Sequence, residues 1–324
     1  MTSQELGATS PEVDLSFVIP VFNSATIIEG IVERILTEYN DLEIEVILVN
    51  DSSGDQSEDV CCSLQRKYSS RCTFVHLSKN FGEHNAVLAG LNFTTGVYVA
   101  VLDDDGQNPP EEVRKMYELA VSGTWDVVYG KYLTVNQGYM RRFGSSLHNS
   151  IATMMLGKSK DLYLSSFKVL SRFVVDEITS YVGSFPFIDG LVLRSTRNIT
   201  QVEVEHHERV AGKSNYTLGG LLSLWLNSFL NFSIIPLRIA AIIGTMMAST
   251  SIILLCLIVI DKLYLNPEVS LGIPTVLITV VFFSGVQLLI LGTIGEYLGR
   301  VFLDQSGNPQ YIVRYVNRRS TRDG

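Results

Sequence analysis

The sequence predicts a mostly parallel α/β domain that is followed by two membrane-spanning helices. Apolar runs alternate with amphipathic stretches between residues 15 and 130, and this alternation is typical of repeated β-α-β units. Farther along the chain, residues 239–260 and 271–295 contain no charged side chain. Each of these segments is longer than the roughly 20 apolar residues that a helix needs to cross a membrane.

The elements of the α/β domain are predicted by local patterns. Short apolar, β-branched runs indicate buried strands, and the capping-box spacing of Thr26 and Glu29 predicts a helix start at that point. The expected strands are residues 15–21, 44–49, 73–77, 97–102 and 126–129. The expected helices are residues 26–39, a polar stretch that ends at 67, and residues 83–92 and 111–121.

The most informative run spans residues 97–112. Its apolar first half ends abruptly at three carboxylates, Asp103, Asp104 and Asp105, and two prolines then precede a new helix. Three carboxylates at the end of a buried strand repel one another unless a cation lies between them. Oxygen-rich sites of this kind suit Mg²⁺ or Mn²⁺. A solvated acidic turn is the alternative, but the strand before the run and the Gln-Asn-Pro-Pro-Glu sequence after it favour a metal site.

Polar residues at the ends of other expected strands indicate a ligand site at the same edge of the sheet as the three aspartates. Ligands of open parallel sheets bind beyond the carboxyl ends of the strands, so we expect Asn23, Asp51, Lys79 and Asp103 to face one crevice. No Gly-x-Gly-x-x-Gly follows the first strand, and no Gly-x-x-x-x-Gly-Lys occurs. The phosphates of a bound nucleotide would therefore be neutralised by a metal ion and not by a glycine loop.

Charge sets the expected partners and membrane topology. The net charge of −8 argues against a nucleic-acid partner. Arg238 precedes the first expected span and several arginines follow the second, whereas residues 261–270 carry one lysine against two acids. The positive-inside rule then predicts a two-span protein of the inner membrane with both termini in the cytoplasm. Four cysteines, Cys61, Cys62, Cys72 and Cys256, lack metal-binding spacing.

Two amphipathic stretches are candidates for the membrane surface. Residues 139–156 could either lie in the headgroup plane or pack on the core, whereas residues 218–232 adjoin the first span, which favours the interface. The expected organisation is then a polar tail (1–14), an α/β domain (15–216), an interfacial helix (217–238), a transmembrane hairpin (239–295) and a cytosolic tail (296–324).

Motifs along nearly the whole chain, in order, resemble a known family. The chain is similar to the polyisoprenyl-phosphate glycosyltransferases of the type-2 glycosyltransferase family, which include dolichol-phosphate mannose synthase and bacterial undecaprenyl-phosphate sugar transferases. The matching segments are residues 17–23, 49–55, 79–86, 102–111, 206–209, 212–216, 236–238 and 295–300.

The resemblance implies a GT-A fold, a uridine- or guanosine-linked sugar donor and a role for each motif. The divalent cation, Mg²⁺ or Mn²⁺, would be held by Asp103, Asp105 and Gln107, with Asp105 counted as catalytic. The lipid phosphate would be bound by Arg209, Lys213 and Ser214, and two cations with a hydroxyl do suit a phosphate, although a solvated polar loop has the same composition. The nucleotide would contact Pro20, Phe22, Asn23, Asp51, Lys79, Asn80, Asp103 and Asp104.

The sequence departs from the family pattern in two places. Ser24 stands where the family commonly has Glu, so a contact near the base would differ. Relatives often carry an aspartate shortly before a Phe-Arg/Lys segment as the catalytic base. Here the nearest carboxylate is Asp161, which we nominate, with Asp189 as a second possibility. A phosphate monoester is already largely dianionic at neutral pH, so orientation matters more than deprotonation and a missing base would be tolerated.

The expected function is the inverting transfer of a sugar, of hexosyltransferase type, from a nucleotide sugar to a polyisoprenyl phosphate such as undecaprenyl phosphate. The transfer would take place at the cytoplasmic membrane face, in an enzyme that is a homo-oligomer like its relatives. A processive polysaccharide synthase is an alternative, although its Gln-x-x-Arg-Trp motif is absent. A non-catalytic scaffold or flippase component is another alternative, and the intact acidic run argues against it.

Overall fold

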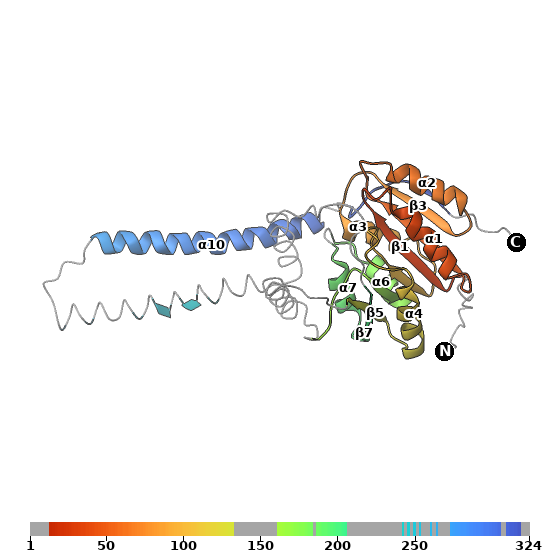
Figure 1. Cartoon of the computed structure of the whole chain (residues 1–324). Helices are drawn as coiled ribbons and strands as arrows, with labels where there is room; N and C mark the ends of the chain where they lie inside the picture. The colour runs from red at the N-terminus through yellow and green to blue at the C-terminus, as the bar shows by residue number, and fades with distance from the viewer. Residues whose placement is uncertain are drawn as a thin grey trace, which may run out of the picture. The chain divides into compact units, whose positions relative to one another are not determined.

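The computed structural model describes residues 13–132, 161–183, 186–205, 273–305 and 309–318, together with a few isolated positions between 242 and 264 (Figure 1). The chain divides into two compact units. The first comprises Met1–Asn215 with Pro309–Gly324, and the second comprises Tyr216–Asn308. The last residues of the chain thus belong to the same unit as the amino-terminal domain.

The first unit is built on one eight-stranded sheet with the strand order β7-β5-β6-β4-β1-β2-β3-β8. The four strands β4, β1, β2 and β3 are parallel neighbours, whereas β6 and β8 run antiparallel to the strands beside them. The predicted α/β class is therefore confirmed. The strands are β1 (Leu15–Val21), β2 (Ile44–Asn50), β3 (Cys72–Leu77), β4 (Tyr98–Val101), β5 (Val127–Tyr132), β6 (Lys168–Ser171), β7 (Ile199–Val204) and β8 (Val313–Asn317).

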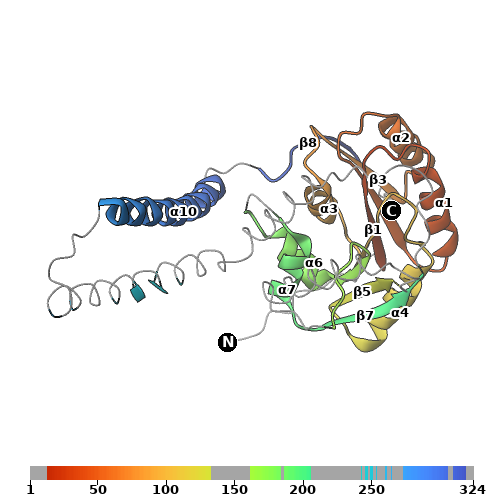
Figure 2. The same cartoon turned by 60° about the vertical axis from the view of Figure 1, so that its left-hand side comes forward.

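Helices cover both faces of the sheet (Figure 2). Buried side chains of α1, α2 and α4 share one apolar cluster, and those of α3, α6 and α7 share a second cluster. The helices of this unit are α1 (Ile28–Glu38), α2 (Ser57–Lys67), α3 (Glu83–Leu91), α4 (Glu112–Gly123), α6 (Arg172–Thr179) and α7 (Ile188–Ser195).

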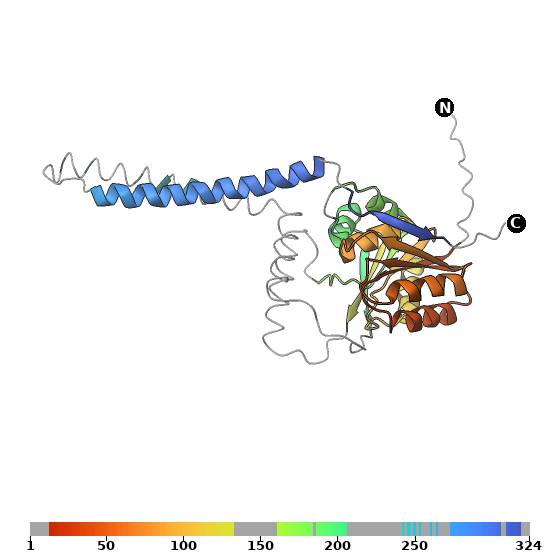
Figure 3. The ribbon, with the colours of Figure 1, turned by 90° about the horizontal axis from the view of Figure 1, so that it is seen from above.

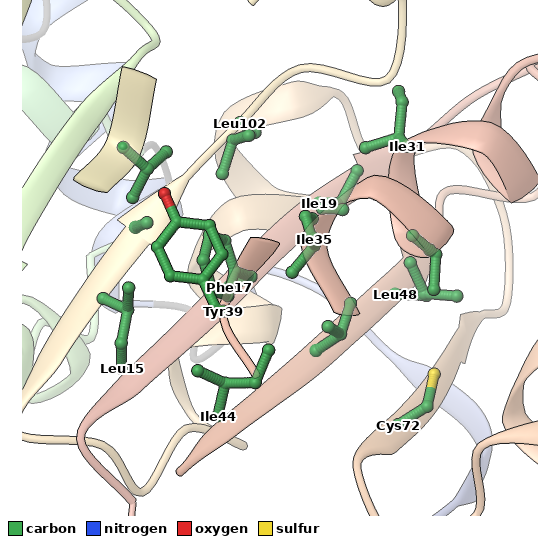
Figure 4. Packing of buried hydrophobic residues seen from close by; sticks show 14 of the residues in the cluster. Leu15, Phe17, Ile19, Ile31, Ile35, Tyr39, Ile44, Leu48, Cys72 and Leu102 are labelled. Carbon is green, nitrogen blue, oxygen red and sulfur yellow. The ribbon is translucent and has the colours of Figure 1, made fainter. Parts of the chain in front are cut away.

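The central strand β1 shows how the sequence produces these two layers. Successive side chains of a strand point to opposite faces, so Leu15, Phe17 and Ile19 pack with α1 while Val18 joins the other cluster. Figure 4 shows the first of these faces, where Tyr39 lies beside Phe17 with ring centres 5.0 Å apart. The run of β1 is apolar at nearly every position because both of its faces are covered.

Helix α1 begins two residues later than the sequence predicts. The expected capping box at Thr26 and Glu29 does not form, since no side chain caps the helix. The Ser24 carbonyl instead accepts hydrogen bonds from the backbone N–H groups of Ile27 and Ile28, at 3.0 and 3.1 Å. A tight turn therefore supplies the first acceptor, which a spacing rule based on side chains does not anticipate.

The edge strand β8 comes from the segment that was expected to be a cytosolic tail. It pairs antiparallel with β3 (Figure 3). In this pairing, His76 lies opposite Tyr315. Further bonds hold the same segment, because Ser78 N–H donates to the Ile312 carbonyl at 2.9 Å and Gln65 Nε2 donates to the Arg318 carbonyl at 3.1 Å. Residues 309–318 thus complete the sheet of the amino-terminal unit.

The second unit contains the long helix α10 (Ile273–Gln305), which covers most of the second expected span, 271–295. Its segment Phe282–Gly299 is long and apolar enough to cross a membrane, and in the described part of the chain it is the one helix that is. Large apolar side chains of α10, such as Leu288 and Phe302, are exposed. The first expected span and the two amphipathic stretches lie largely or wholly outside the described residues.

Candidate active site

The loops that follow β1, β2, β3 and β4 meet at the carboxyl edge of the sheet, because these four strands are parallel neighbours. We call residues 22–25, 51–56 and 78–82, which follow β1, β2 and β3, the three amino-terminal loops. The acidic loop is residues 103–108, which follow β4. The sequence placed most of its candidate site residues in these four loops.

The first two amino-terminal loops hold each other through reciprocal hydrogen bonds. The Asn23 backbone N–H donates to the Ser53 hydroxyl oxygen at 3.0 Å, and the Gly54 N–H donates to the Asn23 side-chain carbonyl at 2.8 Å. Asn23 adopts a left-handed backbone with φ 58°, a conformation that asparagine tolerates better than most residues. Asn23 therefore links the two loops through hydrogen bonds.

Asp51 fixes the third amino-terminal loop. It is 3% exposed, and its two carboxylate oxygens accept hydrogen bonds from the backbone N–H groups of Phe81 (2.7 Å) and Gly82 (2.8 Å). Burial raises the pKa of Asp51, and these two bonds oppose the rise. The same loop exposes the other predicted contacts, Lys79 and Asn80. A contact of any of these side chains with a nucleotide remains a prediction.

Pro20 and Phe22 flank the end of β1. Pro20 is a buried residue of the strand and lies beyond Val18, the last β1 residue that pairs with β4. A proline is tolerated where no partner strand needs its N–H. Phe22 is 44% exposed at the edge of the sheet, so its ring is available to a ligand.

The three consecutive aspartates of the acidic loop point in different directions. Oδ2 of Asp104 accepts hydrogen bonds from the Phe22 backbone N–H (2.7 Å) and from the Ser24 hydroxyl, so Asp104 ties the acidic loop to the loop after β1. Desolvation raises the pKa of Asp104 to about 6, and the charges of its two neighbouring aspartates add to the rise. The Ser24 hydroxyl donates to Asp104, whereas the glutamate that the motif resemblance leads us to expect at this position would repel it.

Asp103 faces β6. Its Oδ2 accepts hydrogen bonds from Asn108 Nδ2 at 3.0 Å and from the Ser166 hydroxyl, a residue that the sequence analysis did not assign to the site. Asp105 accepts from the Gln107 backbone N–H at 3.1 Å. Desolvation raises the pKa of Asp103, and the charge of Asp105 raises it further.

The acidic loop fits a divalent cation by its donor chemistry. Oxygen donors of Asp103, Asp105 and Gln107 are the type that Mg²⁺ and Mn²⁺ prefer. The side-chain oxygen of Asn108, beside Asp103, is buried without a hydrogen-bond partner in the described part of the chain. Among the described residues, no three His, Cys, Asp or Glu side chains form a ready metal cluster.

A buried ion pair lies behind the acidic loop. Lys168 of β6 and Asp189 of α7 are 3% and 8% exposed and form a close salt bridge, and the Tyr129 hydroxyl also donates to Asp189 Oδ1 at 2.9 Å. The positive charge of Lys168 lowers the pKa of Asp103. The sequence signal for Lys168 is a single lysine between the apolar residues Phe167 and Val169.

The two candidate bases have different surroundings. Asp189 already accepts bonds from an ammonium and a phenol. Asp161 is exposed, and its backbone carbonyl accepts from Gln201 Nε2 at 3.0 Å. A third acid that the sequence analysis missed is Glu83, at the start of α3, whose pKa is raised to about 7 by desolvation and then by the charge of Asp103.

The residues expected to bind the lipid phosphate, Arg209, Lys213 and Ser214, lie outside the described residues. Their role therefore stays a prediction. The described site consists of the three amino-terminal loops, the acidic loop and the β6–α7 ion pair. An open parallel sheet with such a carboxyl edge defines an α/β domain that binds its ligand beyond the strand ends.

Comparison with known proteins identifies the family of this domain. The model of glycosyl transferase family 2 matches residues 16–179, which include all four site loops. The chain belongs to glycosyl transferase family 2, and it is a glycosyltransferase of class 2.4. The family resemblance of the motifs is thereby confirmed, and the mostly parallel sheet agrees with the GT-A-like architecture that the resemblance implies.

Full-length relatives are similar over almost the entire chain. The undecaprenyl-phosphate 4-deoxy-4-formamido-L-arabinose transferase of Serratia proteamaculans is 31% identical over 314 residues, which are 96% of this chain and 96% of that protein. The protein of the same name from Yersinia enterocolitica is 31% identical over 93% of each chain. Among solved structures, glucosyl-3-phosphoglycerate synthase from Mycobacterium tuberculosis aligns at 18% identity with a TM-score of 0.49, over 65% of this chain and 74% of that one.

Proposed function

We propose that this chain transfers a sugar from a nucleotide-linked donor to undecaprenyl phosphate at the cytoplasmic face of the inner membrane. The proposal is supported by the names of relatives that match along 93–96% of the chain. The observation that carries it in the structure is the acidic loop, in which Asp103 and Asp105 crowd beside loops that hydrogen bonds already hold in place.

The three amino-terminal loops would receive the nucleotide. Asp51, Asn23 and Ser53 fix the backbone of these loops before any ligand arrives. A preformed pocket reduces the entropy that is lost on binding. Exposed side chains, among them Phe22 and Lys79, would then contact the base and the phosphates.

Asp103, Asp105 and Gln107 would hold the Mg²⁺ or Mn²⁺ ion, which when bound supplies Lewis-acid stabilisation of the nucleoside diphosphate leaving group. Ser166 and Asn108 orient the Asp103 carboxylate by donating to one of its oxygens. Partners of this kind hold a metal ligand in position.

The acceptor oxygen of the lipid phosphate would attack the anomeric carbon of the sugar, and the bond to the nucleoside diphosphate would break with inversion. Arg209, Lys213 and Ser214 would place that phosphate. Because the phosphate is largely dianionic at neutral pH, neither Asp161 nor Asp189 is required as a base, and Asp189 already neutralises Lys168.

The sugar is not set by the reaction class. The relatives' names specify a modified arabinose, which is a pentose, so a pentose is as consistent with this chain as the hexose that the motifs suggested. Membrane attachment through α10 and a second span, with both termini cytoplasmic and a homo-oligomeric assembly, completes the proposal. A water-insoluble acceptor explains why such an enzyme carries apolar helices.

The test is transfer by the purified full-length chain in detergent with undecaprenyl phosphate. A panel of UDP- and GDP-linked sugars, including hexoses and 4-deoxy-4-formamido-L-arabinose, is offered with Mg²⁺, Mn²⁺ or a chelator, and the glycolipid product is measured. At least one donor should give product only with a metal. Asp103→Ala and Asp105→Ala should each lower the rate at least about 100-fold, since even outer-shell partners of metal ligands contribute 10–100-fold.

A matched control is Asp59→Ala, which removes an exposed acid of α2. It should leave the rate unchanged. The proposal is contradicted if no donor is transferred with either metal, or if the Asp103 and Asp105 variants keep the wild-type rate. A protein that binds the nucleotide diphosphate but transfers nothing would instead support the scaffold alternative.

A further inference from the structure

The carboxyl-terminal strand β8 contacts the site through a continuous series of side chains. Tyr315 of β8 lies opposite His76 of β3, and their rings stack with centres 5.0 Å apart and planes 29° apart. The Tyr315 hydroxyl donates to Glu58 of α2 at 2.6 Å. His76 is only 4% exposed, so its ring is enclosed between β2, α2 and β8.

On its other side, His76 bonds to the last residue of β2. His76 Nδ1 lies 3.0 Å from Asn50 Nδ2, and Asn50 is fully buried. The side-chain oxygen of Asn50 accepts from both the backbone N–H (3.1 Å) and the hydroxyl (2.6 Å) of Ser53. The Ser53 oxygen in turn accepts from the Asn23 N–H at 3.0 Å. These contacts connect β8 to two of the three amino-terminal loops.

The hydrogen-bond directions in this series are determined. The Asn50 oxygen faces two Ser53 donors, so its amide nitrogen must point toward His76 and donate. His76 Nδ1 is therefore the acceptor, and its proton is on Nε2, which lies 3.8 Å from Glu58 Oε2. Burial lowers the pKa of His76, which favours this neutral form.

We infer that His76 and Tyr315 are positioning residues for donor binding. Tyr315 of β8, the strand that follows α10, fixes the position of the His76 ring. His76 fixes the orientation of the Asn50 side-chain amide, and the Asn50 amide orders the loop 51–56. The inference rests on the proposed function, because it takes these loops to be the nucleotide site. It assigns to the carboxyl-terminal segment a role in the affinity for the donor, and none in the binding of the lipid.

The decisive variants remove or restore the acceptor at His76 and remove the hydroxyl of Tyr315. His76→Phe keeps a ring to stack on Tyr315 but removes the Nδ1 acceptor, so the buried Asn50 donor loses its partner. His76→Asn returns an acceptor oxygen near the Nδ1 position. Tyr315→Phe keeps the stacked ring and removes the bond to Glu58. Gln65→Leu is the matched control, because it removes a bond to the β8 segment, at the Arg318 carbonyl, without touching the series.

The first measurement is steady-state kinetics with the full-length enzyme and its best donor. His76→Phe should raise the KM for the donor roughly tenfold, as expected for an unsatisfied buried donor, with kcat and the KM for undecaprenyl phosphate within about twofold of wild type. His76→Asn should recover most of the loss, and Tyr315→Phe should raise the donor KM about two- to fivefold. Gln65→Leu should leave it unchanged.

The second measurement is amide hydrogen exchange of residues 50–57, which needs no turnover. His76→Phe should speed exchange there, and His76→Asn should restore slow exchange. Unchanged exchange in His76→Phe, or an equal effect of Gln65→Leu, overturns the inference. If the wild type transfers no sugar, the proposed function fails, but the exchange data still decide whether β8 orders the loop.

Discussion

The three amino-terminal loops and the acidic loop lie at the same edge of one sheet but differ in how their buried negative charge is balanced. In the amino-terminal loops, the buried carboxylate of Asp51 is matched by two backbone N–H groups. In the acidic loop, desolvation and the charge of Asp105 raise the pKa of Asp103, whereas hydrogen bonds from Ser166 and Asn108 and the charge of Lys168 lower it. The buried charge of the amino-terminal loops is thus hydrogen-bonded without a ligand, whereas the acidic loop keeps an excess of negative charge.

Under the proposed function, this difference separates a nucleotide-binding part of the site from a metal-binding part. Loops that bind a neutral base and ribose gain from being rigid, because a preformed surface loses little entropy on binding. A loop that binds a cation needs uncompensated negative charge, and its cost in stability is recovered only when the cation is bound. Three variants test this comparison, and they follow in order of decreasing expected effect.

Lys168→Met should have the largest effect on stability. It leaves Asp189 buried without its cation, and breaking a buried ion pair by removing one partner costs about 3–5 kcal/mol. The melting temperature in detergent should then fall by roughly 6–20 °C. The double variant Lys168→Met with Asp189→Leu should recover most of this loss. If Lys168→Met alone is as stable as the double variant, the unpaired Asp189 carboxylate does not destabilise the fold, and this prediction is wrong.

Asp51→Asn should have an intermediate effect. Asparagine offers one oxygen where two backbone N–H groups need acceptors, so the Phe81 or the Gly82 N–H loses its bond. An unsatisfied buried donor costs about 1–3 kcal/mol, and the donor KM should rise together with the loss of thermal stability. Asp59→Asn, at an exposed site, is the control. Unaltered stability and KM would show that Asp51 does not hold the third loop.

Arg34→Ala should have the smallest effect. The Arg34 guanidinium lies 2.6 Å from Glu111, just beyond the acidic loop, but the two side chains are 42% and 41% exposed. Exposed ion pairs contribute about 0–1 kcal/mol, so the melting temperature and the rate should stay close to wild type. A loss as large as that of Asp51→Asn would mean that surface charge near the acidic loop matters as much as buried bonds.

The central part of the sheet was predictable in detail. β1 was expected at residues 15–21 and is found there, and β2, β3, α3 and α4 differ from expectation by a residue or two. Each β-α unit is local, so its apolar period and its turn residues carry the information. The loops that follow these strands, and hence most of the candidate site, were found by the same reasoning.

The individual side-chain roles were less predictable. The sequence groups Asp103, Asp104 and Asp105 as one acidic run, but the fold directs Asp104 to Ser24 and Asp103 to Ser166. These partners come from loops far away in the sequence, and no spacing rule connects them. Glu83 and Lys168 were missed for the same reason.

The amino-acid sequence was sufficient to predict that strands and helices alternate, that polar residues follow the strand ends, and that apolar segments long enough for a membrane come after them. Those features depend on periodicity and composition, which are local. The folded domain was needed to show that β6 enters the sheet antiparallel between β4 and β5, that β8 lies at the sheet edge beside β3, and which carboxylate receives which donor. Pairing across long stretches of chain depends on contacts that form only when the whole domain folds.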